Sequence, residues 1–165
     1  MALSDVLLIF AQAAMVTAGF GGVVVTLRDH SEHWDEWNRI EFRSILEISG
    51  IIIFFSMLPL VLTTIVEPVV IWRMSILLFA VVHGGVIVVY RISVDSGSIP
   101  PVFNRIHLIA GILIFSQFLA GIFARIEMIQ IAYCAGLAWL LGIGGWLFYL
   151  LAIGAHEAIP EDDET

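Results

Sequence analysis

Five long apolar runs dominate this chain and leave few folds open to it. They contain 19 to 28 residues each and almost no charge, and in chain order they are 6–27, 44–66, 69–90, 106–124 and 128–155. A helix needs roughly 20 apolar residues to cross a bilayer, whereas a barrel strand needs only about 9 to 11. Because lipid offers the backbone no hydrogen bonds, only helices and closed barrels span it. We therefore predict an all-α, polytopic integral membrane bundle of five transmembrane helices.

Composition supports the membrane as the solvent. Hydrophobic residues make up 60% of the 165 residues and charged residues only 13%, whereas soluble domains carry about 25% charged residues. The connections between the runs are too short to bury a core of their own. We expect one transmembrane domain over 1–155, followed by an acidic cytoplasmic tail at 156–165.

The charged and sulfur-containing residues exclude several classes of protein. All seven basic residues are arginines, and the missing lysine excludes Schiff-base retinal proteins, pyridoxal enzymes and Walker-type phosphate sites. The net charge of -8 argues against a nucleic-acid partner, which requires surplus cations. A single cysteine, Cys134, permits neither an intrachain disulfide nor a cysteine-based metal site. With no enzyme signature in the sequence, we expect no catalytic activity, no cofactor and no bound metal.

The arginines predict an orientation, because cytoplasmic loops retain positive charge. The first and third connections lie on the same side of the membrane as the C-terminus, and five arginines flank them: Arg28, Arg39, Arg43, Arg91 and Arg105. The other two, Arg73 and Arg125, lie on the opposite side. We expect the N-terminus outside and the C-terminus inside, in the cytoplasmic membrane.

Two features modify the second helix. Ser31 is a good N-cap, and Trp34, Trp37 and Ile40 follow at a spacing of three, which predicts an interfacial helical turn over 31–43. Further along, Pro59 interrupts the apolar run. Proline removes one backbone donor, so it kinks the helix unless a neighbouring helix satisfies the freed carbonyl.

Small residues recur along the first and last runs at helical spacing. Such faces let helix backbones approach closely, so we expect them to pack against protein. The packing partner is left open between the same chain, a second copy and another membrane subunit, with a homo-oligomer preferred. The residues are Ala14, Ala18, Gly22, Ala138, Gly142 and Gly145.

Among the ionisable residues within the apolar runs, Glu47 and His83 form the best candidate pair. An ionisable group in hydrocarbon is a functional hypothesis by default, and Glu47 and His83 lie on consecutive helices, where a carboxylate and an imidazole could exchange a proton. The alternative is structural: Glu47 pairs with Arg43 four residues earlier, and His83 donates to a backbone carbonyl.

Three uncharged polar residues, Thr17, Ser56 and Gln117, fall nearer the middle of their runs. Hydroxyls and amides at one depth are what a narrow water or ion path needs. The alternative for the two hydroxyls is a bond to the carbonyl four residues earlier in the same helix, with no functional meaning.

Two histidine pairs were weighed as ligand sites. His30 and His33 lie among acidic residues and lack an established metal-binding pattern, so a solvated turn is preferred. His83 and His107 are the only intramembrane pair that a haem could use, but their expected depths differ.

Three functions follow from these residues. The first is a small homo-oligomeric protein that forms a cation-preferring pore lined by Thr17, Ser56 and Gln117, with Glu47 and His83 at its cytoplasmic end. The alternative is a non-conducting accessory or assembly subunit of a larger membrane complex. The third is a haem-binding or proton-relay membrane protein. In each case the bilayer is a partner of the chain.

Overall fold

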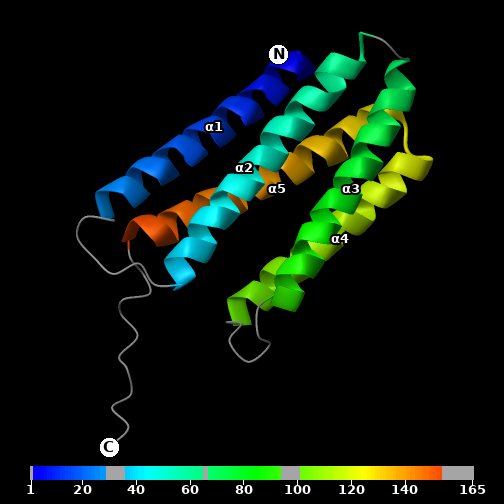
Figure 1. Cartoon of the computed structure of the whole chain (residues 1–165). Coiled ribbons are helices and arrows are strands. Elements are labelled where there is room, and N and C mark those ends of the chain that lie inside the picture. Colours follow the sequence, from blue (N-terminus) through cyan, green and yellow to red (C-terminus); the bar gives the residue numbers. More distant parts are fainter. Residues whose placement is uncertain (1, 29–35, 65–66, 94–100, 154–165) are drawn as a thin grey trace, which may run out of the picture. The chain divides into compact units, whose positions relative to one another are not determined.

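The structure, a computed structural model, describes residues 2–28, 36–64, 67–93 and 101–153. Within these ranges the chain forms five helices (Figure 1): α1 (Leu3–Arg28), α2 (Glu36–Leu62), α3 (Pro68–Ser93), α4 (Pro101–Phe123) and α5 (Ile126–Ile153). Each is long and apolar enough to cross a membrane. Over the described residues, the predicted all-helical fold with five helices long and apolar enough to span a membrane is confirmed.

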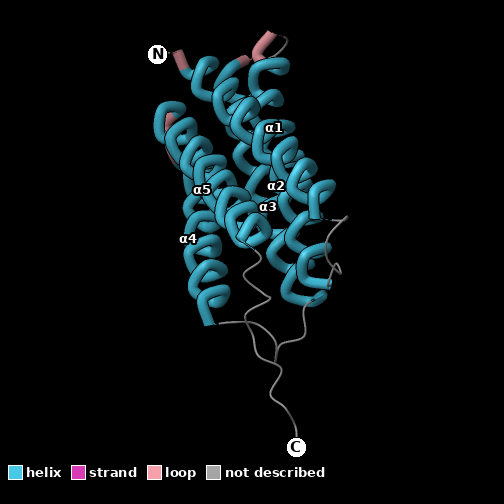
Figure 2. The backbone as a smooth tube through the Cα atoms, turned by 90° about the vertical axis from the view of Figure 1, so that its left-hand side faces the viewer, coloured by secondary structure: helices cyan, strands magenta, loops and turns pink. Residues whose placement is uncertain are grey.

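The helices extend beyond the apolar runs at several ends because polar residues there continue the helical hydrogen bonding. The clearest case is α2, which begins at Glu36, so that residues 36–43 of the expected interfacial turn form its first two turns. Residues 31–35 lie outside the described ranges. Proline occupies the first position of α3 and of α4, where its missing N–H leaves no helical bond unmade. Only short segments join α2 to α3 and α4 to α5 (Figure 2).

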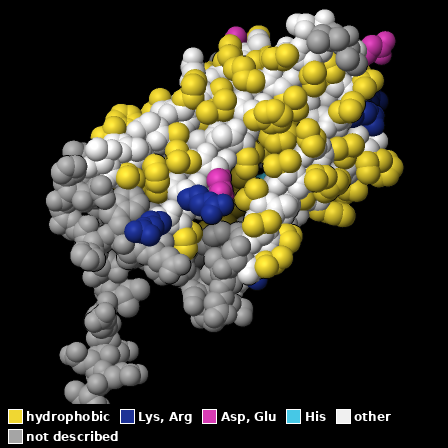
Figure 3. Space-filling view, in the orientation of Figure 1, with side chains coloured by type: hydrophobic (Ala, Val, Ile, Leu, Met, Phe, Trp, Pro, Cys, Tyr) yellow, Lys and Arg dark blue, Asp and Glu magenta, His cyan; other side chains and the backbone are white. Residues whose placement is uncertain are grey.

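Much of the surface of the helices is apolar (Figure 3). Large hydrophobic side chains on all five helices are exposed, and Ile92 and Phe123 are the most exposed of them, at 80% and 78%. Soluble monomers rarely present continuous apolar surface of this kind. Lipid, or another membrane-embedded chain, is the environment that these side chains fit.

Contacts divide the chain into two compact units. The first comprises Met1–Phe54 and Leu140–Thr165, and the second comprises Phe55–Trp139. The first unit therefore holds α1, most of α2 and the second half of α5. The second unit holds the end of α2, all of α3 and α4, and the first half of α5.

The first unit has a core of aliphatic side chains at helical spacing. Its buried aliphatic residues are Leu7, Ala11 and Ala14 from α1, Ile45, Ile48 and Ile52 from α2, and Leu140, Leu147 and Leu151 from α5. Two glycines permit close approach. A Cβ on Gly21 would lie 3.5 Å from Ile45, and one on Gly144 would lie 3.5 Å from Ile48. Both α1 and α5 thus pack against α2 in this unit.

In the second unit α3 and α4 pack along each other as antiparallel neighbours. At one end Arg73 of α3 donates to the carbonyls of Gly121, Ile122 and Ala124, at 3.1, 2.7 and 3.3 Å. The last carbonyls of a helix have no partner within it and carry partial negative charge. Arg73 therefore caps α4 and fixes its end against the start of α3.

Candidate functional site

Six residues of the second unit bring polar groups and aromatic rings together in its interior. On α3 they follow one another at every fourth residue, as Ser75, Phe79 and His83, and none of the three is more than 1% exposed. Ser56 of α2, Gln117 of α4 and Tyr133 of α5 are likewise fully buried. We call Ser56, Ser75, His83, Gln117 and Tyr133 the buried polar cluster.

Four members of the cluster lie at a similar depth. By a rise of about 1.5 Å per residue, Ser56 and Gln117 lie about 9 Å before the ends of α2 and α4. Ser75 and Tyr133 lie about 10 Å after the starts of α3 and α5 by the same rise. These four helix ends meet at one end of the unit, where Arg73 joins α3 to α4. His83 lies two helical turns farther along α3.

The ring of Phe79 occupies the centre of this arrangement. Its centroid lies 4.9 Å from that of Phe55, 5.3 Å from that of Tyr133 and 5.7 Å from that of His83. The imidazole of His83 stacks on it at an interplanar angle of 25°. Since Ser75, Phe79 and His83 occupy successive turns of α3, Phe79 lies between Ser75 and His83 along that helix.

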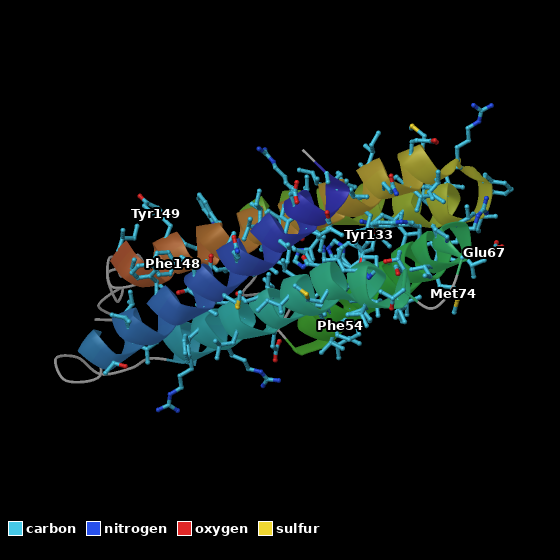
Figure 4. All side chains as sticks on the ribbon, turned by 90° about the horizontal axis from the view of Figure 1, so that it is seen from above. Phe54, Glu67, Met74, Tyr133, Phe148 and Tyr149 are labelled. Carbon is cyan, nitrogen blue, oxygen red and sulfur yellow. The ribbon has the colours of Figure 1, made fainter. Side chains whose placement is uncertain are left out.

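Tyr133 connects α5 to α2 through a backbone carbonyl. Its hydroxyl donates to the carbonyl oxygen of Phe55 at 2.5 Å, and its ring meets Trp72 edge-on at 5.5 Å. Phe55 lies four residues before Pro59, which has no N–H to offer that carbonyl. A neighbouring helix thus supplies the missing donor, and the carbonyl is satisfied inside the bundle. Figure 4 shows Tyr133 among the interior side chains, whereas Met74 and Phe54 project from the helices.

Gln117 is held beside a glycine. Its amide nitrogen donates to the carbonyl of Ala132 at 3.5 Å, a long hydrogen bond. A Cβ built on Gly136 would overlap this amide and would lie 2.5 Å from the ring of Phe79. Gly136 therefore makes the room in which the amide of Gln117 and the ring of Phe79 lie together.

Several polar atoms of the cluster make no hydrogen bond to any described residue. They are the hydroxyl oxygens of Ser56 and Ser75, Nδ1 of His83 and Oε1 of Gln117. Buried polar groups in proteins are nearly always hydrogen-bonded, to protein or to water. An apolar bundle that gathers four such atoms in one unit is suited to holding water or a small polar species there.

Several hydroxyls outside the cluster behave differently. Thr17, Thr26 and Ser116 each donate to a carbonyl of their own helix, at 3.0, 2.9 and 2.7 Å. That is the usual fate of hydroxyls in apolar helices, and Thr17 follows the structural alternative. Ser56 and Ser75 do not bond in this way, which sets these two serines apart.

The remaining predicted site residues fall in other surroundings. Glu47, in the first unit, is exposed and accepts from Nε of Arg43 at 2.7 Å, as in its structural alternative. His83 belongs to the second unit, and its imidazole stacks on Phe79. His107, also in the second unit, is half-buried on α4. His30 and His33 lie outside the described residues. Among the residues that the structure describes, no group of three or more His, Cys, Asp or Glu side chains is placed to hold a metal.

The small residues predicted to pack divide into two groups. Ala14 is fully buried in the first unit, and Ala18 and Gly22 are half-buried. Ala138, Gly142 and Gly145 are exposed on α5, and a Cβ on either glycine would meet no described atom within 4 Å. The close approaches within the chain occur instead at Gly21, Gly121, Gly136 and Gly144.

Sequence reasoning missed four buried polar residues, Glu41, Ser49, Ser75 and Tyr133. Ser75, Phe79 and His83 follow one another at intervals of four residues. This spacing places them on one face of the helix and could have revealed Ser75. Tyr133 was not connected to Pro59, because nothing in the sequence pairs positions so far apart. Glu41 lies in the polar stretch before the second apolar run, yet it is only 5% exposed in the first unit. It begins the buried series that continues with Ile45, Ile48, Ile52 and Phe55, and that spacing could have revealed it.

The cluster is chemically neutral: it offers two aliphatic hydroxyls, a phenol, an amide and an imidazole. These groups donate and accept hydrogen bonds, and an imidazole can also accept a proton on one ring nitrogen and release one from the other. Comparison with known protein families, with curated proteins and with solved structures finds no match for this chain.

Proposed function

We propose that this protein forms a narrow, hydrated permeation path for small cations and that the buried polar cluster is part of that path. The observation that carries the proposal is the set of four polar atoms, on Ser56, Ser75, His83 and Gln117, that hydrogen-bond to no described residue. Leaving such groups without partners costs about 1–3 kcal/mol each. Water in the cluster offsets this cost, because a buried water typically makes two to four hydrogen bonds.

The burial of these residues favours a path within one chain over a path between copies. Ser56, His83 and Gln117 are at most 1% exposed in the single chain, whereas residues that line a pore between subunits must be exposed in each subunit. Thr17 and Glu47, with their own partners, are not needed for this part of the path.

Charge supports a preference for cations. The chain carries a net charge of -8, and negative potential raises the local concentration of cations. The arginine distribution favours an N-terminus outside and a C-terminus in the cytoplasm. With that orientation, the connection at 28–43 and the tail at 156–165 lie on the cytoplasmic side. These two segments contain most of the acidic residues of the chain.

The test is cation flux in vesicles that contain the purified protein. We expect cations to pass in preference to chloride. Ser56→Ala and Ser75→Ala should each lower the flux several-fold, and Gln117→Leu should lower it further. Ser116→Ala is the matched control, because the hydroxyl of Ser116 already bonds to Leu113 of its own helix. Vesicles that pass no cations, or that prefer chloride, would contradict the proposal.

A second candidate is a non-conducting accessory or assembly subunit. The exposed small residues of α5, Ala138, Gly142 and Gly145, favour it because they suit close contact with another helix. Purification from native membranes separates the candidates. A single-species oligomer or monomer that conducts supports the first, and a stoichiometric unrelated partner together with absent flux supports the second.

A further inference from the structure

We propose that the cation carried by this path is the proton, and that His83 passes it beyond an apolar barrier formed by Phe79. This inference rests on the proposed function and names the species transported by the same site. Three observations carry it: the position of Phe79, the surroundings of His83 and the neutral chemistry of the cluster.

Phe79 places an apolar ring at the centre of the unit. Its ring packs against the rings of Phe55 and Tyr133, at 4.9 and 5.3 Å between centroids, and Gly136 approaches it so closely that a single added carbon would lie 2.5 Å away. Hydrophobic constrictions stop hydrated ions because an ion cannot shed its water there. The side chain of Phe79 therefore blocks sodium and potassium ions.

His83 lies directly beyond this barrier. Its imidazole stacks on Phe79 at 5.7 Å, it is 1% exposed, and its Nδ1 bonds to no described residue. A neutral imidazole can accept a proton on its free nitrogen from water on one side and release the other ring proton to water on the opposite side. One proton enters and one leaves, so the ring returns to neutrality as the other tautomer. A rotation of the imidazole ring then restores the starting arrangement. No oxidant or reductant takes part.

The neutral polar groups before and beside Phe79 suit proton transfer better than ion binding. Ser56, Ser75, Gln117 and Tyr133 can order water molecules into a hydrogen-bonded chain. None of these side chains is a carboxylate, so none supplies the fixed negative charge that holds a metal cation in many cation channels.

The experiment compares ions in the same vesicles. Purified protein in phosphatidylcholine and phosphatidylglycerol vesicles is tested for proton flux with a pH-sensitive dye and for potassium and sodium flux with ion-sensitive dyes. We expect the wild-type protein to pass protons at least tenfold faster than either metal ion. His83→Gln should reduce proton flux at least tenfold, whereas His107→Gln, a half-buried histidine of the same unit, should leave it unchanged.

Opening the barrier provides an independent measurement. Phe79→Ala should admit potassium. Phe79→Leu should admit less potassium, because the leucine side chain is closer in volume to phenylalanine than alanine is. Phe115→Ala, at an exposed aromatic of α4, should admit none. Equal proton and potassium flux through the wild type, or full proton flux through His83→Gln, would overturn the inference while leaving cation permeation intact. Absence of every cation flux, protons included, would instead overturn the proposed function.

Discussion

The hydroxyl of Tyr133 donates to the carbonyl of Phe55, the carbonyl that Pro59 leaves without its helical N–H. One hydrogen bond of 2.5 Å thereby joins α5 to α2 and lets a proline remain inside a long apolar helix. Apolar surroundings make this bond valuable, because neither group can turn to bulk water. It also places the ring of Tyr133 against Phe79 and Trp72, at the centre of the second unit.

Tyr133→Phe should destabilise the protein by about 1–3 kcal/mol, because it removes the hydroxyl that donates to a buried carbonyl. The loss should shrink in a Pro59→Ala background, because residue 59 then supplies the N–H that Phe55 lacks. Thermal or denaturant unfolding in detergent measures the four members of this double-mutant cycle.

Tyr149→Phe is the control for that cycle, since Tyr149 is an exposed tyrosine on the same helix. It should change stability little. If Tyr133→Phe were equally destabilising with and without Pro59, the hydroxyl would not be compensating for the proline.

Glycines along α5 should respond to alanine in opposite ways. At Gly136 the new methyl group would overlap the amide of Gln117 and press on the ring of Phe79, so Gly136→Ala should cost about 1–3 kcal/mol, as overpacking does. At Gly142 nothing described lies within 4 Å. Gly142→Ala should be neutral or should stabilise the helix by up to about 1 kcal/mol.

Both variants are compared by unfolding in the same detergent. A large loss of stability in Gly142→Ala would show that a second copy of the chain covers this exposed position. That loss of stability should then depend on protein concentration. A neutral Gly136→Ala would show that Gln117 and Phe79 move aside without cost.

Arg73 should stabilise the unit through the end of α4. Arg73→Met keeps most of the length and removes the three donors to Gly121, Ile122 and Ala124, so we expect a loss of about 1–3 kcal/mol in total, reduced by partial exposure. Hydrogen exchange should rise at the amides of residues 121–129 while the rest of α4 keeps its protection.

Arg125→Met serves as the control for Arg73→Met. It removes the same charge from an exposed position in the short connection between α4 and α5. If both variants weakened the protein equally, the effect would come from net charge and the capping geometry would not matter.

The number and type of helices were predictable because hydrocarbon imposes them: each run in the sequence had to be long and uncharged, and each of the five became a helix. Helix ends were less predictable. The first turns of α2 are polar, and hydrophobicity does not mark where a helix ends once it leaves the apolar layer. The expected starts at 69 and 106 did not use the prolines at 68 and 101, which occupy the first positions of α3 and α4, where proline is favoured.

The candidate site was only half visible in the sequence. Gln117, Ser56 and His83 stood out because a polar residue in an apolar run is conspicuous. The sequence did not show that Thr17 bonds to its own helix while Ser56 does not, since the two hydroxyls differ only in what neighbouring helices place around them. The roles of Phe79 and Gly136 depend on packing between helices, which periodicity alone does not specify.

The expected orientation can be tested with single cysteines in a Cys134→Ala background. Thr64 and Glu127 follow α2 and begin α5, and Ile92 and Asn104 lie at the end of α3 and the start of α4; all four are exposed. A membrane-impermeant maleimide applied to intact cells should label Thr64→Cys and Glu127→Cys. Ile92→Cys and Asn104→Cys should react only after permeabilisation. These changes leave every arginine in place, so the charge that orients the chain is preserved. The reverse pattern would invert the orientation and keep five crossings, whereas labelling of Thr64→Cys and Ile92→Cys from the same side would mean that α3 does not cross the membrane.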